Sequence, residues 1–305
     1  MRDRFCFSRL AFLLFAVQIG TGILLAFYYI PHVDHANESV KEITYVVRFG
    51  WLVRSLHFWA GQGMVVSLAL HLWRMALWGR FKLGCGYGWG TGVIALALTL
   101  AADFTGYILR WDDGTYWALR VGVNLIRSLP LIGGFLFKIA VGGDEIGQPA
   151  LTRFFAWHCL ALPIAILIPL RARCWVCFYR RSREYVRWLI RGEEGFGAVR
   201  SDLAATLVAI SALISLSLLR TPSIGLGYEY ASSVEEAYAP WFFLWVQEML
   251  YHTSSLIGGV LFPLFTFALL LLTPLSSKLH RRAPIAVMGF LTAMAISLSI
   301  ARLLR

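Results

Sequence analysis

The stretch Trp51–Trp78, WLVRSLHFWAGQGMVVSLALHLWRMALW, decides how the rest of the chain is interpreted. It is long and apolar enough to cross a bilayer as one helix, because about 20 residues span the hydrocarbon core. It contains two histidines, His57 and His71, and an arginine lies close to each, Arg54 and Arg74. At about 100° of rotation and 1.5 Å of rise per residue, the histidines share nearly one helix face and lie roughly 21 Å apart.

Imidazoles are rare inside membranes, where they usually have a partner or bind a cofactor. Two of them on one helix face, one in each leaflet, predict two haem irons stacked across the bilayer. The alternative is that both histidines only hydrogen-bond to neighbouring helices.

The composition is that of an integral membrane protein. Of 305 residues, 58% are hydrophobic and 15% are aromatic, far outside the range of soluble domains. We predict an all-α transmembrane fold, a seven-helix membrane bundle with a haem-binding four-helix core in residues 1–200 and a three-helix region in residues 201–305. The seven predicted helices are Leu10–Ile30, Trp51–Trp78, Gly90–Leu109, Phe154–Leu170, Leu203–Leu219, Leu256–Leu272 and Ile285–Ile300.

The net charge of +11 is distributed unevenly along the chain. Basic residues gather before the first predicted helix, around residues 80–82, in 171–200 and around residues 278–282, whereas the alternate loops are acidic. Cytoplasmic loops are enriched in Lys and Arg, so we predict a multi-pass protein of a bacterial-type inner membrane with a cytoplasmic N-terminus. The cluster from Arg171 to Arg200 is interpreted as an anchor to membrane lipid, and the charge pattern does not indicate nucleic acid.

A third histidine, His158, lies near the outer end of the predicted helix Phe154–Leu170, at the depth of His57. Together the two can ligate one iron on the outer side. Gly22, Gly92 and Gly106 are haem-binding candidates, because glycine lets a flat macrocycle approach a helix backbone. Ordinary packing of small residues is the alternative for these glycines.

The chain resembles cytochrome b of the quinol-oxidising cytochrome bc complexes, particularly the plastoquinol and menaquinol branch. The resemblance rests on five ordered motifs: FGWLVRSLHFWAG, LHLWRMALWGRFK, GTGVIALALTLAADFTGYILRWD, SLPLIGG and GQPALTRFFAWHCLALP. It continues in YAPWFFLWVQEML and two further helices, which resemble that branch's smaller second subunit, here fused. It implies two b-type haems, an outer site that oxidises quinol and an inner site that reduces quinone.

Transferred to this sequence, the resemblance makes His57 and His158 the ligands of the outer haem, with Gly22 and Gly106 beside it. It places Arg54 near the propionates of that haem. The resemblance also includes an outer amphipathic hairpin, here Tyr116–Ile139, on which a Rieske-type iron–sulfur protein docks.

The inner site departs from the family pattern. His71 matches one ligand, with Arg74 nearby, but the family's fourth histidine belongs at Ala172 or Arg173 and is absent. Ser8 replaces the glycine expected at the inner haem. We therefore expect an unusual inner centre, with His71 as the only protein imidazole.

The cysteines leave several interpretations open. Cys6 matches a cysteine that binds an extra c-type haem covalently in the plastoquinol branch, although a small apolar role is the alternative. Cys174 and Cys177 form a CxxC without the histidine that c-type haem attachment requires. With Cys6 and Cys85 they could bind an iron–sulfur cluster or zinc, or remain free thiols in a reducing cytosol.

The outer quinol site needs a proton acceptor and aromatic walls. The family's Pro-Glu-Trp-Tyr motif supplies them. The corresponding residues here are Ala239-Pro240-Trp241-Phe242, so the glutamate and the tyrosine are missing. We predict that Glu248 substitutes as catalytic acceptor, with His252 one turn beyond it on an interfacial helix Trp241–His252. A solvated side chain on an amphipathic helix is the alternative for Glu248.

Further candidates lie at the outer end of Gly90–Leu109. Tyr107 and Asp112 complete the predicted catalytic set, and Trp111 joins Trp241 and Phe242 as a quinone-binding residue. Asp103 lies inside this helix, where a carboxylate is energetically costly. It could pair with an arginine, relay protons or contact the altered inner region.

The sequence thus predicts the cytochrome b subunit of a membrane quinol:electron-acceptor oxidoreductase. The predicted partners are a Rieske-type iron–sulfur protein, a c-type cytochrome, quinone and a second copy of the chain. One alternative is a quinone-linked electron-transfer anchor without a complete Q cycle, which the missing histidine and glutamate favour. A transporter or channel without haem is another.

Overall fold

The computed structural model describes residues 7–79, 86–170, 196–229, 238–277, 280 and 282–304, and these residues are predominantly helical. The long helices are α1 (Phe7–Ala26), α3 (Gly50–Leu77), α4 (Gly86–Ile108), the continuous helix Gln148–Leu170, α9 (Phe196–Leu219), α11 (Phe262–Ser276) and α12 (Ala283–Leu303). Shorter helices lie between them: α2 (Ala36–Tyr45), α5 (Asp113–Arg127), α6 (Gly133–Val141) and α10 (Leu244–His252). Among the described residues β structure is limited to one isolated bridge, so the predicted all-α fold is confirmed.

Each of the seven predicted membrane segments contains a helix, but α1 ends at Ala26, four residues before the predicted end at Ile30. Within the described part of the chain, five helices are long and apolar enough to cross a membrane: Arg9–Ala26, Gly88–Ile108, Gln148–Leu170, Ile257–Ser276 and Ala283–Leu303. Helix α3 is 28 residues long but more polar, because it contains both predicted haem histidines and two arginines. In α9 the apolar stretch found is shorter, Thr206–Leu219. The chain is a multi-pass membrane protein.

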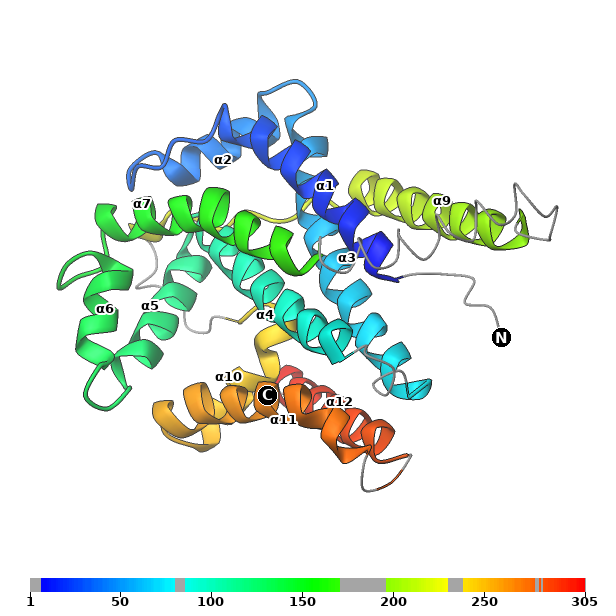
Figure 1. The fold of residues 1–305 in the computed structure, drawn as a ribbon. Helices are drawn as coiled ribbons and strands as arrows, with labels where there is room; N and C mark the ends of the chain where they lie inside the picture. The colour runs from blue at the N-terminus through cyan, green and yellow to red at the C-terminus, as the bar shows by residue number, and fades with distance from the viewer. Residues whose placement is uncertain are drawn as a thin grey trace.

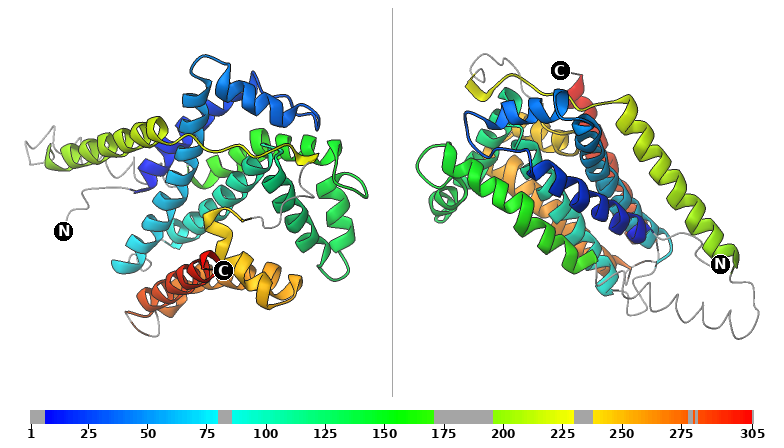
Figure 2. Two further views of the ribbon diagram at one scale, coloured as in Figure 1. Left: turned by 180° about the vertical axis from the view of Figure 1, so that it is seen from behind. Right: turned by 90° about the horizontal axis from the view of Figure 1, so that it is seen from above.

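The long helices run side by side in one bundle (Figure 2). Helices α1, α3, α4 and Gln148–Leu170 form its centre, α9 packs on α3 at one side, and α11 and α12 pack below α3 and α4 in the view of Figure 1. A buried apolar cluster joins α11 and α12 to the centre through residues such as Leu72, Trp89, Leu270 and Met288. The indole of Trp89 also donates to the Leu270 carbonyl across this contact (2.6 Å).

The predicted hairpin is present as α5 and α6, which pack on each other. Helix α5 also packs on α4, and α6 packs on α7 (Gln148–Ala156), the first part of Gln148–Leu170. A capping box begins α5, because the Asp112 side chain accepts from the Thr115 backbone while the Thr115 side chain accepts from the Asp112 N–H. The buried residues of the hairpin include Leu119, Val123 and Phe137. These contacts fix the hairpin over the C-terminal end of α4 and the N-terminal end of α7. This end of the bundle is the one that the sequence predicts to be the outer one, and it is called the outer end here.

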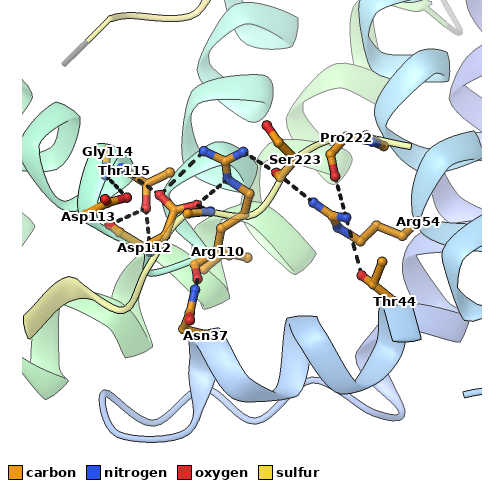
Figure 3. Close-up of polar contacts among 12 residues, drawn as sticks. Asn37, Thr44, Arg54, Arg110, Asp112, Asp113, Gly114, Thr115, Pro222 and Ser223 are labelled. Atoms are coloured by element: carbon orange, nitrogen blue, oxygen red, sulfur yellow. Dashed lines mark hydrogen bonds and ion pairs between the residues drawn. The ribbon is translucent and has the colours of Figure 1, made fainter. Parts of the chain in front are cut away.

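Residues 220–229, named the strap here, follow α9 and cross the outer end of the bundle. Two arginines hold the strap (Figure 3): Arg54 donates to the Pro222 carbonyl (2.8 Å) and Arg110 to the Ser223 carbonyl (2.9 Å). Asp112 accepts from the Gly225 N–H (3.0 Å) and pairs with Arg110 (3.1 Å). The strap is therefore attached to both α3 and the loop that follows α4.

Asp112 is a catalytic candidate from the sequence, but its contacts are those of a structural residue. The carboxylate is 1% exposed, and its two oxygens are occupied by Arg110, Thr115 and Gly225. Replacing Asp112 with asparagine removes the charge that Arg110 faces and one acceptor. Removing one partner of a buried ion pair destabilises the folded protein by about 3 kcal/mol. The Asp112→Asn variant is therefore expected to unfold at a lower temperature, as measured by circular dichroism in detergent.

The matched control for this prediction is Asp144→Asn. The Asp144 side chain is 83% exposed and pairs with Lys138 (2.9 Å). Exposed pairs contribute at most about 1 kcal/mol, so this variant should melt close to the unmodified protein. Equal melting of the two variants would contradict the structural role of Asp112.

Candidate functional site

His57 of α3 and His158 face each other at the outer end of the bundle. Their ring centroids are 6.0 Å apart and the ring planes are inclined by 76°. The two histidines belong to different helices and are 101 positions apart in the chain. The structure thus brings together the pair that the sequence predicts as ligands of one iron.

The hydrogen bonds of both rings leave the Nε2 atoms available. Thr21 donates its only hydroxyl proton to the Val17 carbonyl (2.7 Å), so its oxygen accepts from Nδ1 of His57 (2.9 Å). Nδ1 of His158 donates to the Ala102 carbonyl (3.0 Å). With the proton on Nδ1 in both rings, each Nε2 carries a lone pair. Neither Nε2 has a hydrogen-bond partner within the described ranges.

Two glycines make room for these rings. A Cβ on Gly22 would lie 3.2 Å from Cε1 of His57, and a Cβ on Gly106 would lie 2.5 Å from Cε1 of His158. The second distance is shorter than real side chains tolerate. Glycine is therefore required at position 106 for the observed position of His158, and position 22 is also tight.

A local change of helix type positions His158. It lies in η1 (Trp157–Ala161), a π-helical turn that closes with the Leu162 N–H on the Trp157 carbonyl. Pro163 follows directly and has no N–H to donate, so the regular pattern is interrupted there. The helix accommodates Pro163 with a wider turn, which is a frequent arrangement at functional sites. The same pattern recurs in η4 (Ile257–Leu261), just before Pro263.

The second candidate cluster lies on α10 and on η3 (Trp241–Phe243), so the segment Trp241–His252 is helical as predicted, in two parts. Glu248 is 1% exposed, and its Oε1 lies 2.9 Å from Nε2 of His252, whose side chain is 49% exposed. The predicted pair therefore exists as a hydrogen bond between an internal carboxyl group and a ring at the surface.

Aromatic rings connect this cluster to α4. Phe243 makes an edge-to-face contact with Phe104, with ring centroids 5.8 Å apart, and the Phe242 ring contacts those of Trp241 and Phe243. Trp241 also donates to Gln62 of α3 (2.6 Å). The segment Trp241–Phe243 is consequently attached to α3, which carries His57, and to α4, which contacts His158. The ring of Trp241 remains half exposed.

The two remaining quinol-site candidates differ in accessibility. Trp111 is fully buried in the cluster under the α5–α6 hairpin, against Tyr116 and Tyr228. Its contacts support a packing role in place of the quinone contact predicted from the sequence. Tyr107 is half-buried and lies under the Arg110 guanidinium, 4.6 Å from ring centroid to Cζ.

The family profile described as "Cytochrome b/b6/petB" matches residues 1–177 of this chain. The chain belongs to the cytochrome b/b6 family. The "Cytochrome b6" of Euglena gracilis is 40% identical to it over 160 residues, which cover 52% of this chain and 74% of the relative. That of Prochlorococcus marinus (strain MIT 9515) is 38% identical over 164 residues, covering 54% and 75%.

The fold resembles a solved structure along the whole chain. A chain of the "Hyperthermophilic respiratory Complex III" superposes with a TM-score of 0.72 at 18% identity, covering 100% of this chain and 92% of that chain. At 18% identity, this similarity shows that the two chains have the same fold. It extends past residue 177, where the family match ends.

Membership of the cytochrome b/b6 family implies b-type haem, and the outer end of this bundle fits one. Two imidazoles that share an iron have centroids roughly 6 Å apart, because each metal–nitrogen bond is about 2 Å long. The spacing here is 6.0 Å. Both rings also make the second hydrogen bond, through Nδ1, that is typical of metal-ligating histidines.

Residues predicted at the inner end of this cytochrome are only partly described. His71 is half-buried on α3, Gly92 is buried on α4, and Arg74 lies over the Trp78 ring, 4.9 Å from its centroid. Ala172 and Arg173 lie outside the described residues. So do Cys6, Cys85, Cys174, Cys177 and the basic segment 171–195, and the side chain of Ser8 is not described either.

Several functional residues are visible only in the folded cytochrome. Thr21 and Ala102 each accept a hydrogen bond from one of the two imidazoles. Arg110, like Arg54, donates a hydrogen bond to a carbonyl of the strap. Threonine in an apolar helix and a backbone carbonyl carry no distinctive sequence pattern. Arg54, expected near haem propionates, donates to Thr44 and to the strap carbonyls of Pro222 and Ser223.

Replacing Gly106 with alanine is expected to lower the haem content of this cytochrome. The new methyl group would overlap the His158 ring, which its bond to Ala102 holds in place. Disturbing the shell around a metal ligand typically costs about 10- to 100-fold in affinity. The haem-to-protein ratio, from pyridine haemochrome absorbance, measures the loss.

Gly134→Ala on α6 is the control for this substitution. An added Cβ there would meet nothing within 4 Å, so haem content should stay at the level of the unmodified protein. Full haem occupancy in Gly106→Ala would show that the His158 ring does not need this space.

Proposed function

We propose that this protein is the cytochrome b subunit of a bc-type quinol:electron-acceptor oxidoreductase, and that His57 and His158 ligate its outer haem. The observation that carries the proposal is the facing pair of imidazoles with both Nδ1 atoms engaged and both Nε2 atoms available. The haem, when bound, accepts one electron at a time. The chain positions the ligands and handles the protons.

Glu248 and His252 are the proposed proton path of quinol oxidation. A quinol loses two electrons and two protons, so a nearby base must accept a proton as each hydroxyl is oxidised. The Glu248 carboxylate is shielded from water, and its hydrogen bond to the half-exposed His252 leads outward. A proton accepted on Glu248 can therefore leave through the His252 ring.

Trp241 and Phe242 are proposed to contact the quinol ring. They belong to the aromatic series that reaches Phe104, two residues before Gly106 on α4. A quinol held by this segment would lie close to the haem core, as electron transfer requires. Tyr107 lies on the same helix and stays a candidate for the wall of the pocket.

The partners in this proposal are a Rieske-type iron–sulfur protein at the α5–α6 hairpin, a c-type cytochrome, lipid and a second copy of this chain. The name of the structural relative, a respiratory Complex III, supports assembly with other subunits. We further propose a bacterial-type inner membrane with the N-terminus in the cytoplasm. Residues 1–200 would be the haem core and residues 201–305 the quinol-site region.

The inner site in this proposal holds a second haem with His71 as its protein ligand, and Cys6 is the candidate for covalent attachment. Denaturing electrophoresis with a haem-specific peroxidase stain tests the attachment. A stained band that Cys6→Ser abolishes is expected, and an unstained band would remove the covalent haem from the proposal.

Spectra of the purified complex test the proposed function. A soluble menaquinol analogue should reduce a low-spin b haem, and adding a one-electron oxidant should drive further reduction, because the two quinol electrons then divide between two acceptors. The absence of haem, or haem that only dithionite reduces, would overturn the proposal. Reduction by quinol without the response to oxidant would favour the anchor without a Q cycle, which the comparisons do not support.

A further inference from the structure

Asp103 is a carboxyl group inside the bundle that has no charged partner among the described residues. It lies on α4, about one turn from Gly106 towards the middle of the helix. Its Oδ2 atom is buried and accepts no hydrogen bond, and none of the ion pairs in the described ranges includes Asp103. Pairing with an arginine, one of the roles considered from the sequence, is therefore not supported.

The space for this carboxyl group is made by a glycine on the facing helix. A Cβ on Gly61 of α3 would lie 2.6 Å from Oδ1 of Asp103 and 2.8 Å from Nε2 of Gln18. The Gln18 amide of α1 and the Asp103 carboxyl thus meet at the bare backbone of α3. This is a polar site at the junction of three helices.

The site adjoins the groups that hold both facing histidines. Nε2 of Gln18 donates to the carbonyl of His57 (2.7 Å). Ala102, the residue before Asp103, accepts from Nδ1 of His158 with its carbonyl (3.0 Å). A charge on Asp103 would therefore lie close to the iron that these two rings ligate.

Few other charged or titratable groups face this position. His57 of α3 and His158 of η1 are the titratable groups at this level, and the Cys159 thiol of η1 is exposed. Gln18 and Thr21 of α1 do not titrate, and α11 has no titratable residue. The other charged groups of the packed helices lie elsewhere. Arg9 of α1 is exposed, and Asp113 at the start of α5 accepts from the Gly114 N–H. Five arginines are engaged at other positions: Arg54 on the strap, Arg74 on Trp78, Arg120 on Trp117, Arg127 on Phe137 and Arg153 beside Gly142.

We propose that Asp103 binds a proton when the outer haem gains an electron and releases it when the haem is oxidised again. A negative carboxylate stabilises the ferric iron, which carries one more positive charge, and it loses that stabilisation on reduction. One electron from quinol is then accompanied by one proton from the aqueous phase, so the charge of the site stays constant. This inference rests on the proposed function, since it needs a haem between His57 and His158.

Redox titration of the purified cytochrome, followed by haem absorbance between about pH 6 and 9, tests the inference. The outer haem of the unmodified protein should lose midpoint potential with rising pH, with a slope of up to about 59 mV per pH unit, the one-electron equivalent of a tenfold change. In Asp103→Asn the potential should be independent of pH and higher at the alkaline end. A flat profile in the unmodified protein, or an unchanged slope in Asp103→Asn, would overturn the inference.

Further variants keep the test decisive. Asp103→Ser removes the carboxyl group with a smaller side chain and should give the same flat profile if the asparagine variant does not fold. Asp144→Asn removes an exposed carboxyl group and should keep the slope. A bis-imidazole spectrum in all variants shows that the haem ligands are intact, so a missing slope then rejects only the role of Asp103, whereas a missing spectrum in the unmodified protein rejects the proposed function.

Discussion

Haem is expected to be lost from the outer site when His158 is replaced with alanine. The ring supplies one of two facing nitrogens, and the neighbouring Gly106 offers no side chain that could take its place. Five-coordinate haem is held by one protein bond in place of two. We expect the low-spin b spectrum of this site to disappear and the haem-to-protein ratio to fall by one haem per chain.

The control for this prediction is another histidine of the same outer side. His35→Ala removes a ring that contacts His32 in the loop before α2, and its haem content should equal that of the unmodified protein. If His158→Ala retained a low-spin spectrum with full occupancy, the assignment of the outer ligands would be wrong. His57→Ala should reproduce the loss, because both rings are needed.

Glutamine at position 248 is expected to slow quinol oxidation by about 100- to 10,000-fold, the usual contribution of a general base. The amide has nearly the same shape as the carboxylate and can still meet His252, but it cannot accept a proton. The haem ligands lie on other helices, so the absorbance spectrum should not change. Steady-state reduction of an electron acceptor by quinol measures the effect.

Two comparisons make this second prediction specific. Glu38→Gln changes an exposed carboxylate on α2 that pairs with Lys41, and turnover should stay within about twofold. His252→Ala should slow turnover less than Glu248→Gln, since water can replace the exposed ring. Unchanged turnover in Glu248→Gln would remove Glu248 from the proton path.

The sequence predicts the long helices well because each one is a continuous apolar run of membrane-spanning length. A run such as Phe262–Ser276 must be helical in a bilayer, where every backbone polar group needs a partner within the segment. The pairing of His57 with His158 is also predictable, because the positions of the two histidines along their helices place them at the same depth in the membrane. Likewise, the link from Glu248 to His252 follows from their spacing of one turn on α10.

The remaining features depend on contacts between segments far apart in the chain. Asp112 and Trp111 lie in a motif that resembles a quinol site, yet the strap and the hairpin cover them. The strap itself has no periodic pattern that would place it. The π-helical turn at His158 is also a local response to Pro163, and sequence spacing indicates only a kink there.

The strap has a consequence for assembly. The family branch that this chain resembles divides the same helices between two polypeptides, which must find each other by diffusion. Here α9 and the strap continue from the haem core, and Arg54, Arg110 and Asp112 fasten the strap across the outer end (Figure 3). Joining two parts in one chain replaces a concentration-dependent encounter with an intramolecular one. Diluting the solubilised protein should therefore not separate α10, α11 and α12 from the helices that carry His57 and His158.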